Sequence, residues 1–194
     1  MDMDTFTRVG TTGSTFETLL LEGGQDVSCA YPVNDLLAMK LWRNPCWFSA
    51  RLNFLALHFN VPVYRWIEER CGLPRPEFVV LFTLYLKNGL TSTAISTSTG
   101  FPKNTISRAV QKLLKKNIIK REASSGDLRS FVLILNDKGR AIVNDSMELM
   151  VAREREMLQG LTAAEQLMLS ELLAKVAVCS ERWSDTLIKQ ETTK

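Results

Sequence analysis

Seven basic residues and no acidic residue occur between Thr91 and Arg121. They are Lys103, Arg108, Lys112, Lys115, Lys116, Lys120 and Arg121. A helix face that meets only water usually mixes both signs, because opposite charges four residues apart stabilise a helix and like charges destabilise it. The whole chain has a net charge of only +3, so this excess is local. It favours binding to a polyanion over the alternative of a solvated helix face.

The residues around these cations have the pattern of two helices joined by a tight turn. Residues 92–99 can form a short helix that ends at Gly100. A second helix is expected over residues 103–116, because its apolar residues recur with the helical period: Ile106, Ala109, Val110, Leu113 and Leu114. The opposite face of this helix is polar and basic. The layout predicts a helix-turn-helix, whose second helix can enter the major groove of DNA.

Two strand-like runs follow the second helix. Residues 118–123 and 129–135 are joined by a short segment that contains Ser-Ser-Gly-Asp, which predicts a β-hairpin. The tip of the hairpin carries Asp127 and Arg129. A helix-turn-helix followed by such a hairpin is a winged helix, and its wing can reach a flanking minor groove. The alternative is a hairpin that packs only for stability.

The rest of the chain predicts further helices on both sides of the winged helix. We expect a mainly α fold with a small β-hairpin wing, in which a winged helix-turn-helix is flanked by N- and C-terminal dimerisation helices. Pro62 is expected to kink the long N-terminal helix, and Thr162 with Glu165 forms a capping box for the last helix. The expected parts are a disordered N-terminal tail (1–32), N-terminal dimerisation helices (33–72), the DNA-binding lobe (73–139), C-terminal dimerisation helices (140–186) and a tail (187–194).

Composition excludes several classes of protein. The chain has 194 residues, of which 45% are apolar and 23% charged, as in soluble globular proteins. Its acidic start lacks an apolar signal region and no run approaches about 20 apolar residues, so we expect a cytoplasmic protein without membrane contact. Four cysteines without C-x-x-C spacing suggest neither a metal site nor a disulfide framework. A single histidine and the lack of catalytic motifs argue against an enzyme, and no cofactor is expected.

These elements, in this order, resemble the MarR family of bacterial winged-helix transcription regulators. The matching segments lie within residues 46–185 and read GLPRPEF, LTSTAISTSTGFPKNTISRAVQKLLKKNIIKRE, GDLRSFVLILNDKG and LTAAE. The D-x-R of the wing, joined to the L-x-x-x-G that follows, is the most specific part. Two positions depart from the family pattern: Ser96 stands where an alanine is usual, and no Asp or Ser caps the recognition helix near Pro102. The missing cap would leave the first N–H groups of that helix free for a phosphate.

The resemblance implies a homodimeric repressor that binds a near-palindromic promoter site and is released by a small molecule. Arg129 is expected to enter the minor groove, with Asp127 holding it or a neighbouring cation in place. Bases and nearby phosphates are expected to be contacted by the wing and by the exposed start of the recognition helix: Lys103, Asn104, Thr105, Ser107, Arg108, Lys112, Asp127 and Arg129. The later cations of the run are expected to contact phosphate or solvent.

Ten of the sixteen aromatic residues lie between Trp42 and Tyr85. They can form the core and the dimer interface. The alternative is a pocket for a small aromatic effector, as the family implies, with candidate residues His58, Tyr64, Arg65, Phe82 and Tyr85.

Two other functions remain open. Cys46, near the start of the long N-terminal helix, could serve a thiol-based oxidation sensor, because helix N-termini favour thiolates; an inert thiol is the alternative. A winged helix can also bind proteins or act as DNA architecture. A sequence-specific regulator should prefer its own site over random duplex by a factor of roughly 10³ or more.

Overall fold

The computed structural model describes residues 35–123 and 131–183. The described residues fall into two compact units that divide between Pro62 and Val63. The two expected tails and the wing tip, with Asp127 and Arg129, lie outside the described residues.

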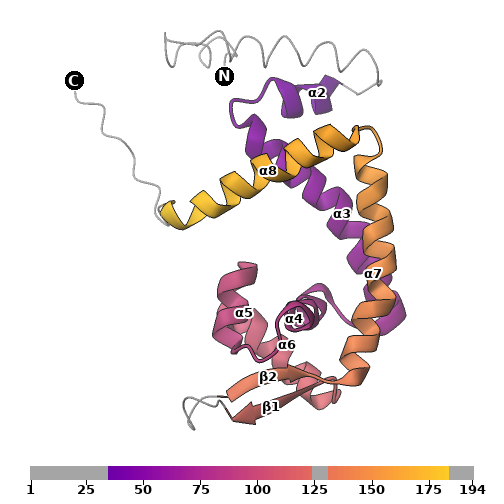
Figure 1. The fold of residues 1–194 in the computed structure, drawn as a ribbon, viewed down its shortest axis with the longest axis vertical. Coiled ribbons are helices and arrows are strands. Elements are labelled where there is room, and N and C mark those ends of the chain that lie inside the picture. Colours follow the sequence, from indigo (N-terminus) through magenta and orange to yellow (C-terminus); the bar gives the residue numbers. More distant parts are fainter. Residues whose placement is uncertain (1–34, 124–130, 184–194) are drawn as a thin grey trace, which may run out of the picture. The chain divides into compact units, whose positions relative to one another are not determined.

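The described chain is mainly helical and contains one two-stranded antiparallel hairpin, so the predicted fold class is confirmed (Figure 1). None of the described helices is both long and apolar enough to span a membrane. The elements are α2 (Asp35–Trp42), α3 (Trp47–Cys71), α4 (Arg75–Leu86), α5 (Ser92–Thr99), α6 (Lys103–Lys115), β1 (Ile119–Ala123), β2 (Phe131–Leu135), α7 (Asp137–Leu158), α8 (Ala163–Cys179) and the 3₁₀ turn η2 (Ser180–Arg182).

In the first unit, Arg51 connects α2 to the start of α3. Its Nε donates a hydrogen bond of 2.8 Å to the carbonyl of Leu41. Its guanidinium lies 5.0 Å from the ring centre of Trp47 and 5.9 Å from that of Trp42, within the range of cation–π attraction. Helix α3 then continues through Pro62, the residue at which the two units divide.

Helix α4 is the centre of the second unit. Pro76 stands in its first turn, where the missing N–H costs nothing. Its buried residues contact α5, α6, α7 and β2. With residues from these neighbours, from the end of α3, from the turn before α4 and from β1, they form one apolar core: Ile67, Leu73, Phe78, Val80, Leu81, Leu84, Ile95, Ile106, Val110, Leu113, Ile119, Leu133 and Val143.

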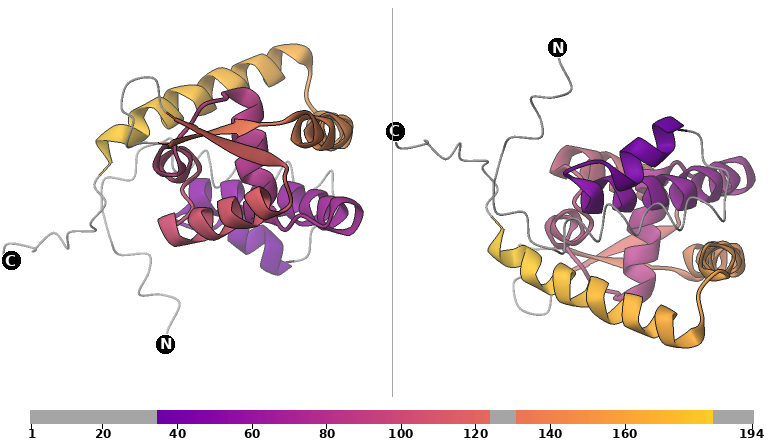
Figure 2. Two further views of the ribbon diagram at one scale, coloured as in Figure 1. Left: turned by 90° about the horizontal axis from the view of Figure 1, so that it is seen from below. Right: turned by 90° about the horizontal axis from the view of Figure 1, so that it is seen from above.

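The hairpin is fixed to this core along one face. Strands β1 and β2 pair in antiparallel register, and an isolated bridge joins Leu90 to Leu133. Leu133 and Leu135 are buried as the alternation of β2 predicts. Phe131 is 57% exposed, because it pairs with Ala123 at the outer end of the hairpin. The hairpin leads directly into α7, which Figure 2 shows end-on.

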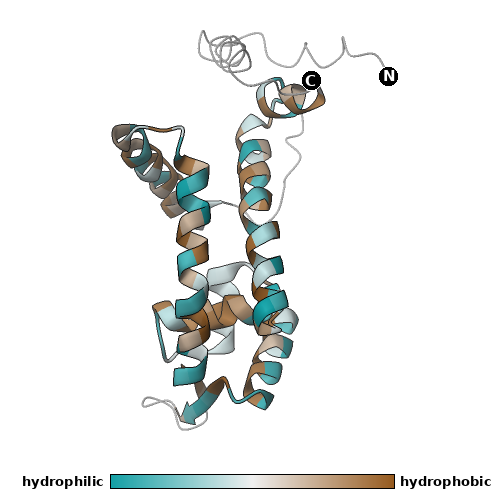
Figure 3. Ribbon diagram, turned by 90° about the vertical axis from the view of Figure 1, so that its right-hand side faces the viewer, coloured by the Kyte–Doolittle hydropathy of each residue, from teal (hydrophilic) through white to brown (hydrophobic). Residues whose placement is uncertain are grey.

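Helices α7 and α8 both begin with a side-chain cap, and the cap of α8 is the one that the sequence predicts. The Oδ1 of Asn136 accepts a hydrogen bond of 3.0 Å from the amide of Gly139, which starts α7. Thr162 and Glu165 form the capping box of α8. Both helices carry hydrophobic residues along their length (Figure 3). No residue of α8 is buried among the described residues, so this helix leaves an apolar surface open.

Candidate nucleic-acid interface

The second helix of the helix-turn-helix, α6, has one buried and one exposed face. Its apolar stripe is buried against α4 and α5. Lys103, Asn104, Ser107, Arg108 and Lys112 are exposed on the other side, and Thr105 is half-buried. The side chains predicted to meet DNA from this helix are therefore at the surface or at its edge, whereas their contacts with DNA stay a prediction.

The turn between α5 and α6 uses the serine that departs from the family pattern. Gly100 ends α5 with φ +70°, and its amide donates to the carbonyl of Ser96. Ser96 is buried, and its Oγ donates a hydrogen bond of 2.7 Å to the carbonyl of Phe101. The hydroxyl that serine adds here, and that alanine lacks, thus forms a hydrogen bond with the backbone just before the recognition helix.

The start of α6 lacks a side-chain cap. Pro102 occupies the N-cap position, and no side chain there accepts a hydrogen bond. Asn104 Oδ1 accepts from the amide of Thr105 at 2.8 Å, and the carbonyl of Pro102 accepts from Thr105 and Ile106. Within the described residues, this leaves the amides of Lys103 and Asn104 without an acceptor, as the sequence predicts.

An acidic residue from another helix contacts two cations at the end of α6, one in its last turn and one at its C-cap. Glu77, in the first turn of α4, places Oε1 3.2 Å from Lys112 Nζ and Oε2 2.9 Å from Lys116 Nζ. On the wing, Lys120 pairs with Glu122 at 2.7 Å. Three lysines of the basic run, Lys112, Lys116 and Lys120, are therefore paired with an acid of the chain itself.

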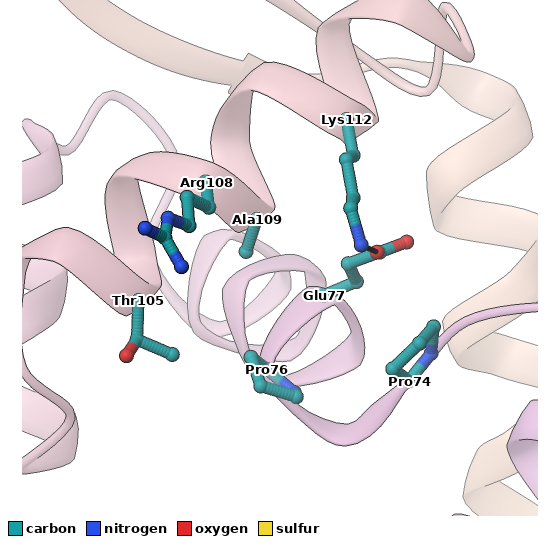
Figure 4. A pocket seen from close by; sticks show the side chains of 7 residues that line it. All are labelled: Pro74, Pro76, Glu77, Thr105, Arg108, Ala109 and Lys112. Carbon is teal, nitrogen blue, oxygen red and sulfur yellow. Dashed lines mark ion pairs between the residues drawn. The ribbon is translucent and has the colours of Figure 1, made fainter.

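Glu77 was not found by reading the sequence, because it lies more than thirty residues before the lysines that it contacts. The signal that could have indicated its role is that it is the one acidic residue in the first turn of a largely apolar helix. Figure 4 shows Lys112 reaching from α6 to Glu77, while Arg108 extends elsewhere. The two helices enclose a hollow of about 190 Å³ here, lined by Pro74, Pro76, Glu77, Thr105, Arg108, Ala109 and Lys112.

Two of the candidate effector residues, Tyr64 and Phe82, belong to a row of aromatic rings. Tyr64 meets the edge of Phe78 with ring centres 6.2 Å apart, and Phe78 stacks on Phe82 at 6.3 Å. The guanidinium of Arg75 lies 5.1 Å from the Tyr64 ring. Burial raises the pKa of Tyr64, and Arg75 acts in the opposite direction.

The other three candidates differ in their surroundings. The guanidinium carbon of Arg140, in α7, lies 5.7 Å from the ring centre of Tyr85. Arg65 is exposed. His58, in the first unit, is exposed and stacks beside Phe54 with ring centres 4.0 Å apart. None of the five lines the hollow of about 560 Å³ between α3 and α7, which Trp66, Arg70, Asp145, Glu148, Leu149 and Ala152 form.

The cysteines of the described residues are free thiols. Cys46 is exposed, and its amide donates to Asn44 Oδ1 at 2.8 Å. Burial raises the pKa of the Cys71 thiol, and the nearby Arg70 acts against it. In the same part of the chain, no cluster of His, Cys, Asp and Glu side chains could hold a metal ion.

Together, α5, α6 and the β1–β2 hairpin define a winged helix-turn-helix. Residues 72–130 match the sequence model of the MarR family. This span includes α4, both helices of the helix-turn-helix and β1. Over these residues the chain therefore matches the MarR family of transcriptional regulators, as the sequence resemblance implies. That family and the relatives below are regulators, not enzymes.

The chain is similar to one curated relative, an uncharacterized HTH-type transcriptional regulator, YwaE, of Bacillus subtilis (strain 168). The two are 27% identical over 100 residues, which cover 52% of this chain and 58% of the relative. The chain thus spans little more than half the length of that protein.

Two solved structures share the fold. A MarR/EmrR family transcriptional regulator from Acinetobacter sp. ADP1 is 24% identical with a TM-score of 0.61, covering 70% of this chain and 95% of that one. The Mycobacterium tuberculosis MarR family protein Rv2887, in complex with salicylic acid, is 25% identical with a TM-score of 0.54, covering 66% and 95%.

Proposed function

We propose that the protein is a homodimeric, sequence-specific DNA-binding repressor that acts in the cytoplasm on a near-palindromic promoter site. The observation that carries the proposal is the exposed face of α6. Arginine and asparagine side chains can each pair with the edge of one base through two hydrogen bonds, and Arg108 and Asn104 are exposed on this face. Lys103 and the free amides at the start of the helix can take neighbouring phosphates.

Two copies of the chain are proposed because α8 has an apolar surface and nothing that covers it among the described residues. Its large apolar side chains are exposed: Leu167, Met168, Leu169, Leu172, Leu173, Val176 and Val178. A surface of this kind usually marks a protein interface. A twofold dimer would present two copies of α6 to successive half-sites on one face of DNA, which accounts for the proposed near-palindrome.

A small aromatic ligand is the proposed signal for release from DNA. The support is the family and the Rv2887 complex, which holds salicylic acid. Within this chain, the row of Tyr64, Phe78 and Phe82 with Arg75 at one end combines aromatic surface with a cation, the pair of features that an aromatic acid requires.

The test of the proposed function is selection of bound duplexes from a random library by the full-length chain. We expect a recovered near-palindromic duplex to bind roughly 10³-fold or more tightly than a scrambled duplex of the same base composition. Equal binding of both duplexes would refute sequence-specific regulation and favour an architectural or protein-binding winged helix.

A further inference from the structure

Glu77 is the buried acidic centre of an otherwise basic surface. Its side chain is 3% exposed, and its two carboxylate oxygens each contact a different lysine, Lys112 in α6 and Lys116 at the C-cap of α6. Lys116 Nζ also donates to the carbonyl of Gly72 at 2.9 Å, in the turn before α4. The carboxylate therefore ties the last turns of α6 to the start of α4.

The two lysines differ in exposure and in the number of acceptors that their ammonium groups contact. Lys116 is 41% exposed and has two acceptors from the fold, so its ammonium group is held in place. Lys112 is 62% exposed, and within the described residues its ammonium group contacts only the carboxylate, at the longer distance of 3.2 Å. The three side chains together carry one net positive charge, so Glu77 removes one unit of charge from the face that would meet a polyanion.

We propose that Glu77 is a positioning residue that sets the specificity of DNA binding. It holds the end of α6 against α4 and draws Lys112 toward the fold, so that the start of the helix, with Asn104 and Arg108, determines how the helix docks. Phosphate contacts carry no sequence information of their own, and an additional mobile phosphate contact strengthens binding to every duplex. The inference rests on the proposed function of sequence-specific binding.

The test compares Glu77→Gln with the wild-type chain on the selected duplex and on the scrambled one, across a salt titration. Glutamine keeps the shape of the side chain and removes its charge. We expect affinity for the scrambled duplex to rise roughly three- to tenfold at ~100 mM salt, since Lys112 becomes free for a phosphate. The slope of log affinity against log salt should steepen by about 0.9, the value for one added contact, and the preference for the selected duplex should fall about tenfold.

Three variants serve as controls. Glu154→Gln, on the exposed surface of α7, changes the net charge equally and should leave both slope and preference near the wild-type values. Lys115→Gln, exposed on α6, should weaken binding to both duplexes and flatten the slope by about 0.9. Lys116→Gln should change the slope by less than a third of that amount, because the ammonium group of Lys116 is already bonded to Glu77 and to the carbonyl of Gly72. If Glu77→Gln does not fold, the comparison of Lys116→Gln with Lys115→Gln tests the inference in its place.

The outcomes separate this inference from the proposed function. If the wild-type chain prefers its selected duplex and Glu77→Gln shows an unchanged or flatter slope, the positioning role is wrong and sequence-specific binding stands. A Lys116→Gln variant that flattens the slope as much as Lys115→Gln would also overturn it. If the wild-type chain shows no preference for any duplex, the proposed function fails and this inference fails with it.

Discussion

Arg108 and Lys115 are both exposed on α6, but Arg108 lies in the first half of the helix, about two turns before Lys115. Arg108 is near the start, where a recognition helix reaches base edges, and Lys115 is the last helical residue. A comparison of these two positions therefore separates base reading from phosphate contact. Lys116 is less suitable for the comparison, since it is bonded to Glu77 and to the carbonyl of Gly72.

We predict that Arg108→Ala removes most of the discrimination between the selected and scrambled duplexes, while Lys115→Ala weakens binding to both about equally. A bidentate arginine–guanine pair contributes about 1–3 kcal/mol of discrimination. Binding titrations at one fixed salt concentration measure both effects. Equal loss of discrimination in the two variants would contradict the assumed docking of α6.

The hydroxyl of Ser96 is a second single-residue feature with a measurable effect. We predict that Ser96→Ala lowers the free energy of unfolding by about 1 kcal/mol, because the hydrogen bond from its Oγ to the carbonyl of Phe101 is lost within a half-buried turn. Urea unfolding followed by circular dichroism measures the change. An unchanged or higher stability would show that the bond contributes nothing net to this turn.

At the scale of elements, the junction between the wing and α7 depends on a close approach. A Cβ added to Gly139 would lie 2.5 Å from the Cδ1 of Leu135 and 2.8 Å from the carbonyl oxygen of Ile118. The carbonyl belongs to the backbone, so it cannot rotate away. This contact explains why the L-x-x-x-G that follows the wing needs its glycine.

We predict that Gly139→Ala lowers the free energy of unfolding by about 1–3 kcal/mol, the usual cost of overpacking. Gly160→Ala is the matched control, because a Cβ there would meet no atom within 4 Å. Urea unfolding of both variants tests the contact. Similar stability of Gly139→Ala and Gly160→Ala would mean that the junction relaxes freely.

The wing remains a prediction from the sequence, since its tip lies outside the described residues. We predict that Arg129→Ala flattens the salt slope by about one unit and weakens binding more on duplexes with A·T-rich flanks than with G·C-rich flanks. Asp127→Ala should act in the same direction and more weakly. Salt titrations on two duplexes that differ only in their flanks measure this, and unchanged binding of Arg129→Ala on both would show that the wing does not touch DNA.

At the scale of the whole molecule, α8 is too apolar to remain in water along its length. Seven of its large apolar side chains are exposed, and none of its residues is buried among the described ones. We predict that Leu172→Glu converts a dimer into a monomer close to the 21.9 kDa of one chain. The reason is that a dimer would bury the charge of the new carboxylate without a partner.

Sedimentation equilibrium at micromolar concentration measures the mass of the wild-type chain and of this variant. Lys175→Gln, exposed on the same helix, is the control and should remain dimeric. A wild-type chain that sediments as a monomer and still prefers its selected duplex would contradict the dimer.

Most of the fold was determined by the sequence locally. The apolar stripe of α6 follows the helical period, Gly100 and Gly72 end their helices at positive φ, and Asn136 and Thr162 cap theirs. Each of these signals involves residues only a few positions apart, so a short segment of sequence is enough to predict where its helix begins or ends. The same locality explains why the helix-turn-helix and the hairpin could be recognised without coordinates.

The tertiary structure alone decided which charges remain available. The pairing of Glu77 with Lys112 and Lys116 joins residues more than thirty positions apart, and it exists because α4 packs across α6 in the core. The same holds for Gly139, whose constraint comes from Ile118 and Leu135 meeting at one point. The sequence determined that α6 is basic on its exposed face, because charge and period are local properties. Packing between distant segments decided which of these cations pair with an acid of the chain and which stay free. No local sequence pattern contains that information.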